Sequence, residues 1–334
     1  MTARRIEDHA MPAPRSARHG ARRLGRRRFL TLSAAAGGVV GAGALAGRRA
    51  GAVPVIRWDG VAMGTAASIT LAHPEAARLI ARARAEIDRL EDVFSLYRAG
   101  SALSRLNTEG ALARPPFELL DCLTLCGAVH GATAGLFDPT VQPLWRLHAD
   151  SHAAGAAPSA AAVAAARALT GWDGVRLDAA RVTLARPGMA LTLNGVAQGY
   201  IADRVARLLA AEGLGDILVD TGEMRALGGH PKGGAWPVSL AVEGTIVPDA
   251  VALRDRALAS SAPRGTTFDA AGTQGHILDP RSGAPSALPW RLVSVTAPSA
   301  ALADALSSAF CLMERPAIDA TLAAFPAARL AWIG

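Results

Sequence analysis

Residues 191–205 read LTLNGVAQGYIADRV, and this stretch decides the fold prediction. An apolar segment ends at Leu193, two turn residues follow, and Val196 and Ile201 then begin an apolar face with helical spacing. Gly213 is a residue that can take the left-handed conformation common after the last turn of a helix. The stretch therefore predicts a strand, a tight turn and a helix.

The predicted turn also suits an anion. A helix start leaves backbone N–H groups unpaired, and the helix dipole favours negative charge there, so the position suits a phosphate. Asn194 and Gln198 add neutral hydrogen-bonding groups, while Gly195 and Gly199 leave the backbone open to a ligand. The alternative is an ordinary connection whose glycines serve helix-to-sheet packing, and the stretch alone leaves both open.

The charge of the chain is concentrated at its start. The whole sequence has 334 residues and a formal net charge of +7. Residues 1–46 hold nine arginines and two acidic residues, which already accounts for that net charge. The remainder is neutral, so the high isoelectric point gives no reason to expect nucleic-acid binding.

Residues 1–46 predict an export signal. Arg26-Arg27-Arg28-Phe29-Leu30 precedes an uncharged run rich in Ala and Gly from Thr31 to Ala46, and this resembles a twin-arginine signal. The alternative of a transmembrane anchor fits less well, because the run is shorter than the ~20 residues that span a bilayer. We expect a periplasmic protein with a signal at 1–46, cleaved or kept as an inner-membrane anchor, a linker at 47–57 and a catalytic domain at 58–334.

The rest of the chain alternates helical and strand patterns without regular βαβ spacing. This indicates an α+β fold in which antiparallel sheets are flanked by helices. Helices are expected from Pro74 to Phe94, after Ser101, and over 117–133, 158–169 and 299–313. Strands are expected over 58–71, interrupted by Gly64, and over 216–220, 236–242 and 251–259.

Four residues outside the central stretch have the chemistry of a ligand site. Met63 lies beside Gly64 and could accommodate a flat ring, and Tyr97 is one of two tyrosines. Asp138 precedes a proline that keeps it out of helical conformation, and His276 begins the turn His-Ile-Leu-Asp-Pro-Arg-Ser-Gly. Each of them alone has an ordinary structural explanation.

The predicted helix over 299–313 carries a possible metal site. Asp304, Ser307 and Ser308 have i, i+3 and i+4 spacing, which puts them side by side. One carboxylate with hydroxyl oxygens suits Mg²⁺, and the alternative is a solvated polar face. The three cysteines, Cys122, Cys126 and Cys311, lie in apolar helical stretches, so we assign them to the core.

Seven segments together resemble the FAD:protein FMN transferase family, also called the ApbE family. The chain has no Walker loop, no dinucleotide-binding glycine fingerprint, no His-Glu-Xaa-Xaa-His and no nucleophile-elbow serine. The segments are Met63-Gly64-Thr65, 94–107, 135–141, 194–200, 222–225, 276–283 and 303–306, in the order of the family.

The resemblance implies a fold and an activity. It implies one two-lobed catalytic unit that binds FAD in the cleft between its lobes. It also implies that FAD is split with Mg²⁺ and that FMN is esterified through its phosphate to a Ser or Thr of a target flavoprotein, releasing AMP. The alternatives are a flavin carrier without transfer activity and an FAD pyrophosphatase that gives FMN and AMP.

The resemblance also implies roles for individual residues. His276 would be the general base, and with Asp304 it would form the catalytic pair. The FAD site would comprise Met63, Tyr97, Leu136, Phe137, Asp138, Thr192, Gln198, His276 and Ile277. The metal ligands would be Gly195, Asp304, Ser307 and Ser308.

Three positions depart from the commonest family pattern. Many members have Asp where this chain has Thr192, Lys where it has Gln198, and Thr where it has Ser308. Together with the twin-arginine leader, the Leu-Asn-Gly-Val-Ala-Gln-Gly form resembles the subgroup associated with nitrous-oxide respiration. Its target would be a membrane-bound electron-transfer flavoprotein that faces the periplasm.

Overall fold

All strand pairings in the described part of the chain are antiparallel. The computed structural model describes residues 53–248 and 250–334, so the predicted signal at 1–46 and most of the predicted linker at 47–57 lie outside the described residues. The first strand begins at Val55 rather than at Trp58. The large sheet has the order β1 (Val55–Ala62), β2 (Thr65–Ala72), β6 (Ile217–Asp220), β7 (Met224–Leu227), β12 (Ala257–Ser261), β13 (Val293–Ala297) and β14 (Arg329–Ile333).

Three small sheets accompany the large one within the described residues. They are β3 (Ala111–Ala113) with β5 (Arg181–Leu184) and β4 (Val175–Leu177), β11 (Val251–Leu253) with β8 (Trp236–Val238), and β10 (Thr245–Ile246) with β9 (Ala241–Val242). The helices are α1 (Ala76–Phe94), α2 (Ala102–Glu109), α3 (Phe117–Ala132), α4 (Gln142–Ala153), α5 (Ala160–Arg167), α6 (Ala197–Ala211), α7 (Ala300–Phe310) and α8 (Arg315–Ala324). The predicted α+β class, with antiparallel sheets flanked by helices, is confirmed.

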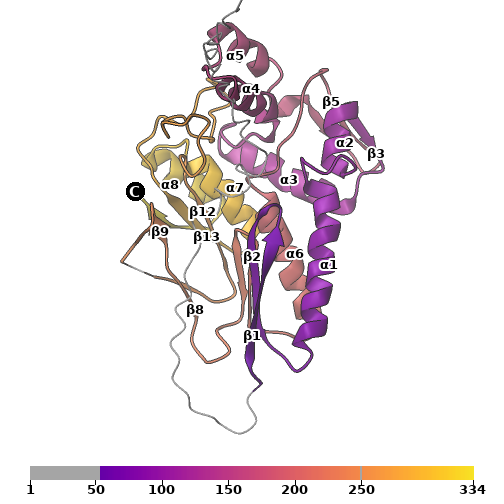
Figure 1. Cartoon of the computed structure of the whole chain (residues 1–334), viewed down its shortest axis with the longest axis vertical. Helices are drawn as coiled ribbons and strands as arrows, with labels where there is room; N and C mark the ends of the chain where they lie inside the picture. Colours follow the sequence, from indigo (N-terminus) through magenta and orange to yellow (C-terminus); the bar gives the residue numbers. More distant parts are fainter. Residues whose placement is uncertain (1–52, 249) are drawn as a thin grey trace, which may run out of the picture.

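The large sheet buries both of its faces at the central strands. Side chains alternate between the faces of a strand, so Ile217 and Val219 enter the main core while Leu218 enters a second, smaller one. Helices α1, α6 and α7 cover the main-core face. Trp236 and its neighbours on β8 and β11 cover the other face at β6, β7 and β12. The part with α2 to α5 lies at one end of this layered body (Figure 1).

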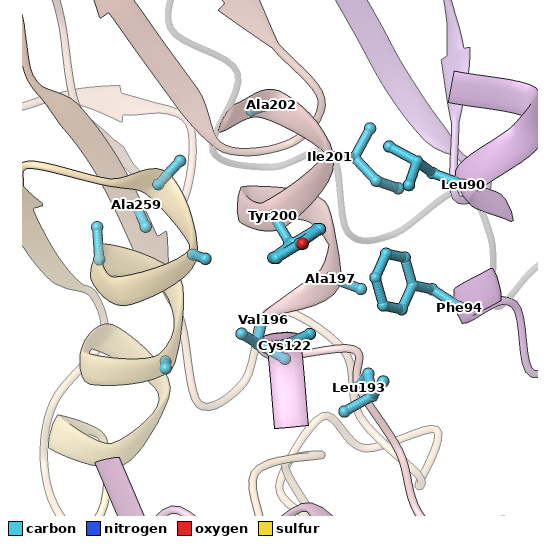
Figure 2. Packing of buried hydrophobic residues seen from close by; sticks show 14 of the residues in the cluster. Leu90, Phe94, Cys122, Leu193, Val196, Ala197, Tyr200, Ile201, Ala202 and Ala259 are labelled. Atoms are coloured by element: carbon cyan, nitrogen blue, oxygen red, sulfur yellow. The ribbon is translucent and has the colours of Figure 1, made fainter. Parts of the chain in front are cut away.

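Helix α6 is the centre of the helical layer. Figure 2 shows Ile201 and Tyr200 of α6 facing Leu90 and Phe94 of α1. The rings of Phe94 and Tyr200 meet edge to face with centroids 5.3 Å apart. Gly199 lies on the opposite side, where a Cβ atom would be 2.3 Å from the carbonyl oxygen of Ala300. At Gly199 the glycine therefore permits close packing of α6 against α7.

The predicted helices are confirmed, and their ends show why. Ser101 and Ser299 accept hydrogen bonds from the backbone N–H groups of Ser104 and Leu302 at the first turns of α2 and α7. Helix α6 ends at Ala211, and Gly213 follows with φ 88°. Cys122, Cys126 and Cys311 are free thiols, and they are buried in the core as predicted. Within the described residues, no helix combines the length and apolar character needed to cross a membrane.

Four strand predictions are wrong in detail. The segment 58–71 is two strands, because the chain reverses at Met63-Gly64, where both residues have positive φ. The segment before α6 is not a strand, since the amide of Asn107 rather than a neighbouring strand pairs the backbone N–H and C=O of Leu191. Turns also divide 236–242 into β8 and β9, and 251–259 into β11 and β12.

Candidate functional site

A cleft of about 620 Å³ is lined by residues of the large sheet, of α1, α4, α6 and α7, and of the loops between these elements. Most of the lining comes from the β1–β2 turn, the segment after α1, the segment before α4, residues 192–198 at the start of α6, β12 with the loop after it, the segments 276–278 and 290–292, and α7. These segments are far apart in the sequence. The antiparallel sheet and the helices behind it bring them together.

The β1–β2 turn forms one wall of the cleft. Met63 and Gly64 have φ values of 49° and 80°, the left-handed pair of a tight hairpin turn. The backbone N–H of Met63 donates to the Glu91 carboxylate at 2.7 Å, and Arg98 contacts the same carboxylate at 2.6 Å. The turn is therefore tied to the end of α1, which holds Met63 at the lining of the cleft.

Tyr97 presents an exposed aromatic ring at the cleft. Its side chain has an exposed fraction of 62% although it lines the cleft. The hydroxyl of Ser95 accepts hydrogen bonds from the N–H groups of Tyr97 and Arg98, both at 3.1 Å, and so fixes the turn after α1. A ring that is held in place but left uncovered suits a flat ligand.

Asp138 is buried at the cleft and shapes the wall opposite α6. Its carboxylate accepts hydrogen bonds from the backbone N–H and the hydroxyl of Thr140, at 2.8 and 2.6 Å. Burial raises the pKa of Asp138, and the bonds from Thr140 oppose that rise. The carbonyl of Pro139 accepts the N–H of Thr192, which joins this segment to the α6 connection. Leu136 and Phe137 line the cleft beside it.

The start of α6 offers fewer free N–H groups than the sequence predicts. The N–H groups of Val196 and Ala197 donate to the carbonyl of Leu193, and that of Gly199 points to Asp304 at 3.4 Å. The amide of Gln198 donates to the hydroxyl of Thr65 at 2.6 Å. Most donors of this turn therefore already have a partner, which lies within the turn itself, on the β1–β2 hairpin or on α7.

Two buried carboxylates lie together where α7 meets the cleft. Asp304 is 3% exposed and has one N–H contact, from Gly199. Glu223 is 8% exposed and accepts the N–H of Ser260 at 3.2 Å. Burial raises the pKa of Asp304 to about 8, and burial and the Asp304 charge raise the pKa of Glu223 well above its usual range. Among residues 53–248 and 250–334, no cationic side chain forms an ion pair with this acidic pair, Asp304 and Glu223.

Serine hydroxyls and a glycine surround the acidic pair. The hydroxyl of Ser308 lies 3.2 Å from that of Ser261, and a Cβ atom on Gly195 would be 2.9 Å from the Ser308 oxygen. Ser307 lies deeper, because its hydroxyl bonds to the carbonyl of Asp304 and to Ser261 and it is fully buried. It is the one predicted site residue that does not line the cleft.

His276 lines the cleft with one ring nitrogen already committed. Its Nδ1 lies 3.0 Å from the carbonyl oxygen of Thr266, and since a carbonyl only accepts, Nδ1 carries the proton. Nε2 is then the basic nitrogen. Burial lowers the pKa of His276, and contacts with the carbonyls of Thr266 and Pro263 oppose that fall. The ring is therefore neutral at neutral pH and able to accept a proton.

The cleft brings the other predicted site residues together. Its lining includes Met63, Tyr97, Leu136, Phe137, Asp138, Thr192, Gly195, Gln198, His276, Ile277, Asp304 and Ser308. Sequence reasoning assigned no role to Glu223, although it lies in the quoted Gly-Glu-Met-Arg segment directly after a strand. The signal in the sequence that could have found Glu223 is a carboxylate shortly after a buried strand. Within residues 53–248 and 250–334, no three His, Cys, Asp or Glu side chains cluster as metal ligands.

The chain is similar to a set of known flavin transferases. A model of the ApbE family matches residues 63–330. A FAD:protein FMN transferase of Klebsiella pneumoniae (strain 342) is 31% identical over 266 residues, which cover 74% of this chain and 75% of that protein. The apo crystal structure of the Pseudomonas stutzeri flavinyl transferase ApbE is 26% identical with a TM-score of 0.73 and covers 82% of this chain and 89% of that one. The ApbE protein of Thermotoga maritima has a TM-score of 0.74 at 25% identity, covering 83% of this chain and 93% of that one.

Proposed function

The chain belongs to the ApbE family, and on that premise we propose that it transfers the FMN part of FAD to a Ser or Thr hydroxyl of a target protein. The hydroxyl oxygen attacks the phosphorus of the FMN half, and a phosphoester bond forms. The phosphoanhydride bond to the AMP half breaks, and AMP leaves with the bridging oxygen. The proton of the hydroxyl goes to a base of the enzyme.

One observation carries this proposal: a neutral histidine and an uncompensated acidic pair line the same cleft. Nε2 of His276 is the basic ring nitrogen, because Nδ1 donates to Thr266. A neutral imidazole can take the proton of an incoming hydroxyl, a step worth about 10²–10⁴-fold in rate. Binding to Thr266 also fixes the ring orientation, so His276 keeps Nε2 available for the acceptor hydroxyl.

The residues near Asp304 fit Mg²⁺. The donor set is oxygen only, and each carboxylate of the acidic pair has one N–H contact. Burial raises the pKa of both carboxylates, and a bound cation would stabilise their ionised form. Hard oxygen donors of this kind suit Mg²⁺, which binds one or two carboxylates and completes its shell with water and phosphate. Asp304, Ser308 and the backbone of Gly195 would hold it. When bound, Mg²⁺ neutralises the charge on the phosphate oxygens.

The wall residues position the flavin half of the substrate. Tyr97 supplies an exposed ring, and Met63 a flexible apolar side chain, on segments that Glu91 and Arg98 hold together. Phe137 and Ile277 add apolar surface. An apolar, shaped wall next to the acidic pair places a flat ring system on one side and a charged diphosphate on the other.

We also propose the cellular setting from the sequence alone. The segment Arg26-Arg27-Arg28-Phe29-Leu30 supports export through the twin-arginine route and action in the periplasm. The target is then a flavoprotein that faces the periplasm, and the form of the 191–205 stretch supports an electron-transfer protein of nitrous-oxide respiration. Replacing Arg26 and Arg27 by Lys should keep the protein in the cytoplasm, as cell fractionation would report.

A labelling experiment tests the transferase. The purified full-length chain is incubated with FAD, Mg²⁺ and a flavin-acceptor protein, and the products are run on a denaturing gel for flavin fluorescence. We expect fluorescence on the acceptor that disappears with EDTA and with an acceptor whose target Ser or Thr is Ala. Free FMN and AMP without labelling would indicate a pyrophosphatase, and unchanged FAD would indicate a flavin carrier.

A further inference from the structure

The cleft has an excess of acidic residues over available cations. Its acidic lining residues are Glu91, Asp138, Glu223, Glu243 and Asp304. Its arginines are Arg98, Arg264 and Arg291, and the single lysine of the sequence, Lys232, is not among the lining residues. A dinucleotide brings a diphosphate into this cleft, so any unpaired cation at its lining is a candidate for contact with that group.

Arg98 is not available for that contact. Its guanidinium binds the carboxylates of Asp88, Glu91 and Asp92, each within 2.7 Å. The side chains of Arg264 and Arg291, in contrast, make no hydrogen bond or ion pair within the described part of the chain. Of the arginines that the structure describes at this lining, these two therefore have guanidinium groups without a partner among the described residues.

Arg264 sits on a rigid turn. Residues 262–265 form a turn that is closed by a hydrogen bond of 2.9 Å from the N–H of Gly265 to the carbonyl of Ala262. Pro263 occupies the second position of the turn, where its fixed φ is favourable. A Cβ atom on Gly275 would be 2.2 Å from the carbonyl oxygen of Pro263, so the neighbouring segment packs directly on the turn.

The residue that follows this turn, Thr266, is bonded to His276. The carbonyl of Thr266, two residues after Arg264, accepts both the backbone N–H and Nδ1 of His276. At the other end of this segment, Ser260 donates to Glu223 and Ser261 contacts Ser308. Arg264 therefore lies on the stretch that runs from the acidic pair to the base.

We propose that Arg264 binds a phosphate of FAD beside His276. This inference rests on the proposed function: the phosphorus under attack must lie near both His276 and the acidic pair, and the segment 260–266 connects these two places. A guanidinium matches the paired oxygens of a phosphate. The segment of Arg291 is bonded to other parts of the fold, because the indole of Trp290 donates to the carbonyl of Met313 and the N–H of Arg291 donates to the carbonyl of Gly334.

The test compares two flavins that differ in phosphate. FAD and riboflavin share the ring system, but riboflavin lacks the diphosphate. Their dissociation constants are measured by flavin fluorescence with the full-length chain and Mg²⁺, without acceptor, and chromatography confirms that FAD stays intact. In Arg264→Ala we expect FAD binding to weaken about tenfold, the scale of one charge-assisted hydrogen-bonding group, and riboflavin binding to stay within about twofold.

Two further variants make the result specific. Arg264→Lys keeps the charge and should restore part of the FAD affinity. Arg291→Ala removes the other unpaired arginine of the cleft and should change FAD binding by less than about twofold, the size expected for an exposed charge that makes no direct contact.

Several outcomes would overturn the inference. These are unchanged FAD binding in Arg264→Ala, an equal loss for FAD and riboflavin, or an equal loss in Arg291→Ala. An Arg264→Ala variant that binds FAD normally but has a higher KM for the acceptor would assign Arg264 to the acceptor protein instead. If the unmodified chain labels its acceptor, these results leave the transferase standing; if it neither binds nor splits FAD, both proposals fail.

Discussion

Asp203 on α6 and Asp304 on α7 are two buried aspartates on neighbouring helices, yet their surroundings differ. Asp203 accepts the N–H groups of Ala300 and Ala301 at 2.9 and 3.0 Å and pairs with Arg225 at 3.3 Å. Asp304 has one N–H contact at 3.4 Å and the Glu223 carboxylate for a neighbour. Burial raises the pKa of both, but only around Asp203 does a cation oppose the rise.

His148 and His276 are also alike in the direction of their pKa shift but differ in their surroundings. His148 donates from Nε2 to the carbonyl of Gly283 at 2.8 Å and stacks on Phe268 outside the cleft lining. His276 donates from Nδ1 and lines the cleft. Burial lowers the pKa of both. A perturbed pKa is therefore shared by packing and site residues, and what distinguishes His276 is that it lines the cleft.

The largest expected effect is on the Asp304 side of the comparison. Asp304→Asn should lower the transfer rate about 10²–10³-fold, because the charge that holds the cation is lost. The melting temperature should stay the same or rise, because the amide carries no charge to be desolvated. Initial rates of acceptor labelling and thermal unfolding measure the two effects. A rate within tenfold of the unmodified enzyme would remove Asp304 from the metal site.

The histidine pair predicts the next largest effect. His276→Gln should lower kcat about 100-fold, the lower range for loss of a general base, while KM for FAD changes little. The matched variant His148→Gln should keep kcat within about twofold, because His148 does not line the cleft. Steady-state labelling kinetics of both variants give the comparison, and similar losses in the two would mean that His276 acts through packing.

The Asp203 side of the comparison predicts a change in stability rather than in rate. Asp203→Asn should lower the free energy of unfolding by about 2–3 kcal/mol, because Arg225 loses its partner while one N–H of α7 keeps an acceptor. Denaturant unfolding measures this value. Labelling at 20 °C should stay near that of the unmodified chain, and a large loss of rate in a folded variant would contradict a purely structural Asp203.

The pH profile sharpens the histidine contrast. His276 must be neutral to accept a proton, and burial places its pKa below the ordinary value near 6.5. The value of kcat/KM should therefore hold down to below pH 6.5 and then fall about tenfold per pH unit. In the unfolded chain this histidine has its ordinary pKa near 6.5, so it binds a proton more readily than in the folded chain. The free energy of unfolding therefore also falls as the pH drops from 6.5 to the lower pKa of the folded chain. His148→Gln should not move the break in kcat/KM.

Six of the eight described helices were predicted, because their signals are local, while α4 and α8 were not predicted. The apolar positions of α1 recur at steps of three and four, and Ser101 and Ser299 supply caps within three residues of the groups they bind. The strands were less predictable, since a strand's hydrogen bonds lie on another segment. The pattern of residues 58–71 does not show that the chain reverses at Met63. Nor does the apolar segment that ends at Leu193 show that its backbone bonds to the side chain of Asn107 instead of to a neighbouring strand.

The candidate site shows the same division. Sequence motifs predicted the residues from Met63 to Ser308 that the cleft collects, but placed Ser307 with them, although its hydroxyl is used inside the fold. Glu223 and Arg264 were missed as site residues. Neither has a local signal strong enough, because the importance of each depends on neighbours more than ten residues away in the chain.

The sequence by itself determined the family, the α+β class, six of the eight described helices and most residue types of the site, because periodicity, caps and short motifs lie in neighbouring residues. Tertiary structure decided the strand order that pairs β2 with β6, the closeness of Gly199 to Ala300, and the meeting of Glu223 with Asp304. It also decided that the carboxylate of Asp203 lies beside Arg225, while that of Asp304 lies beside the carboxylate of Glu223. Such contacts join residues separated by about 80 to 150 positions, and only the folded chain brings their charges within reach of one another.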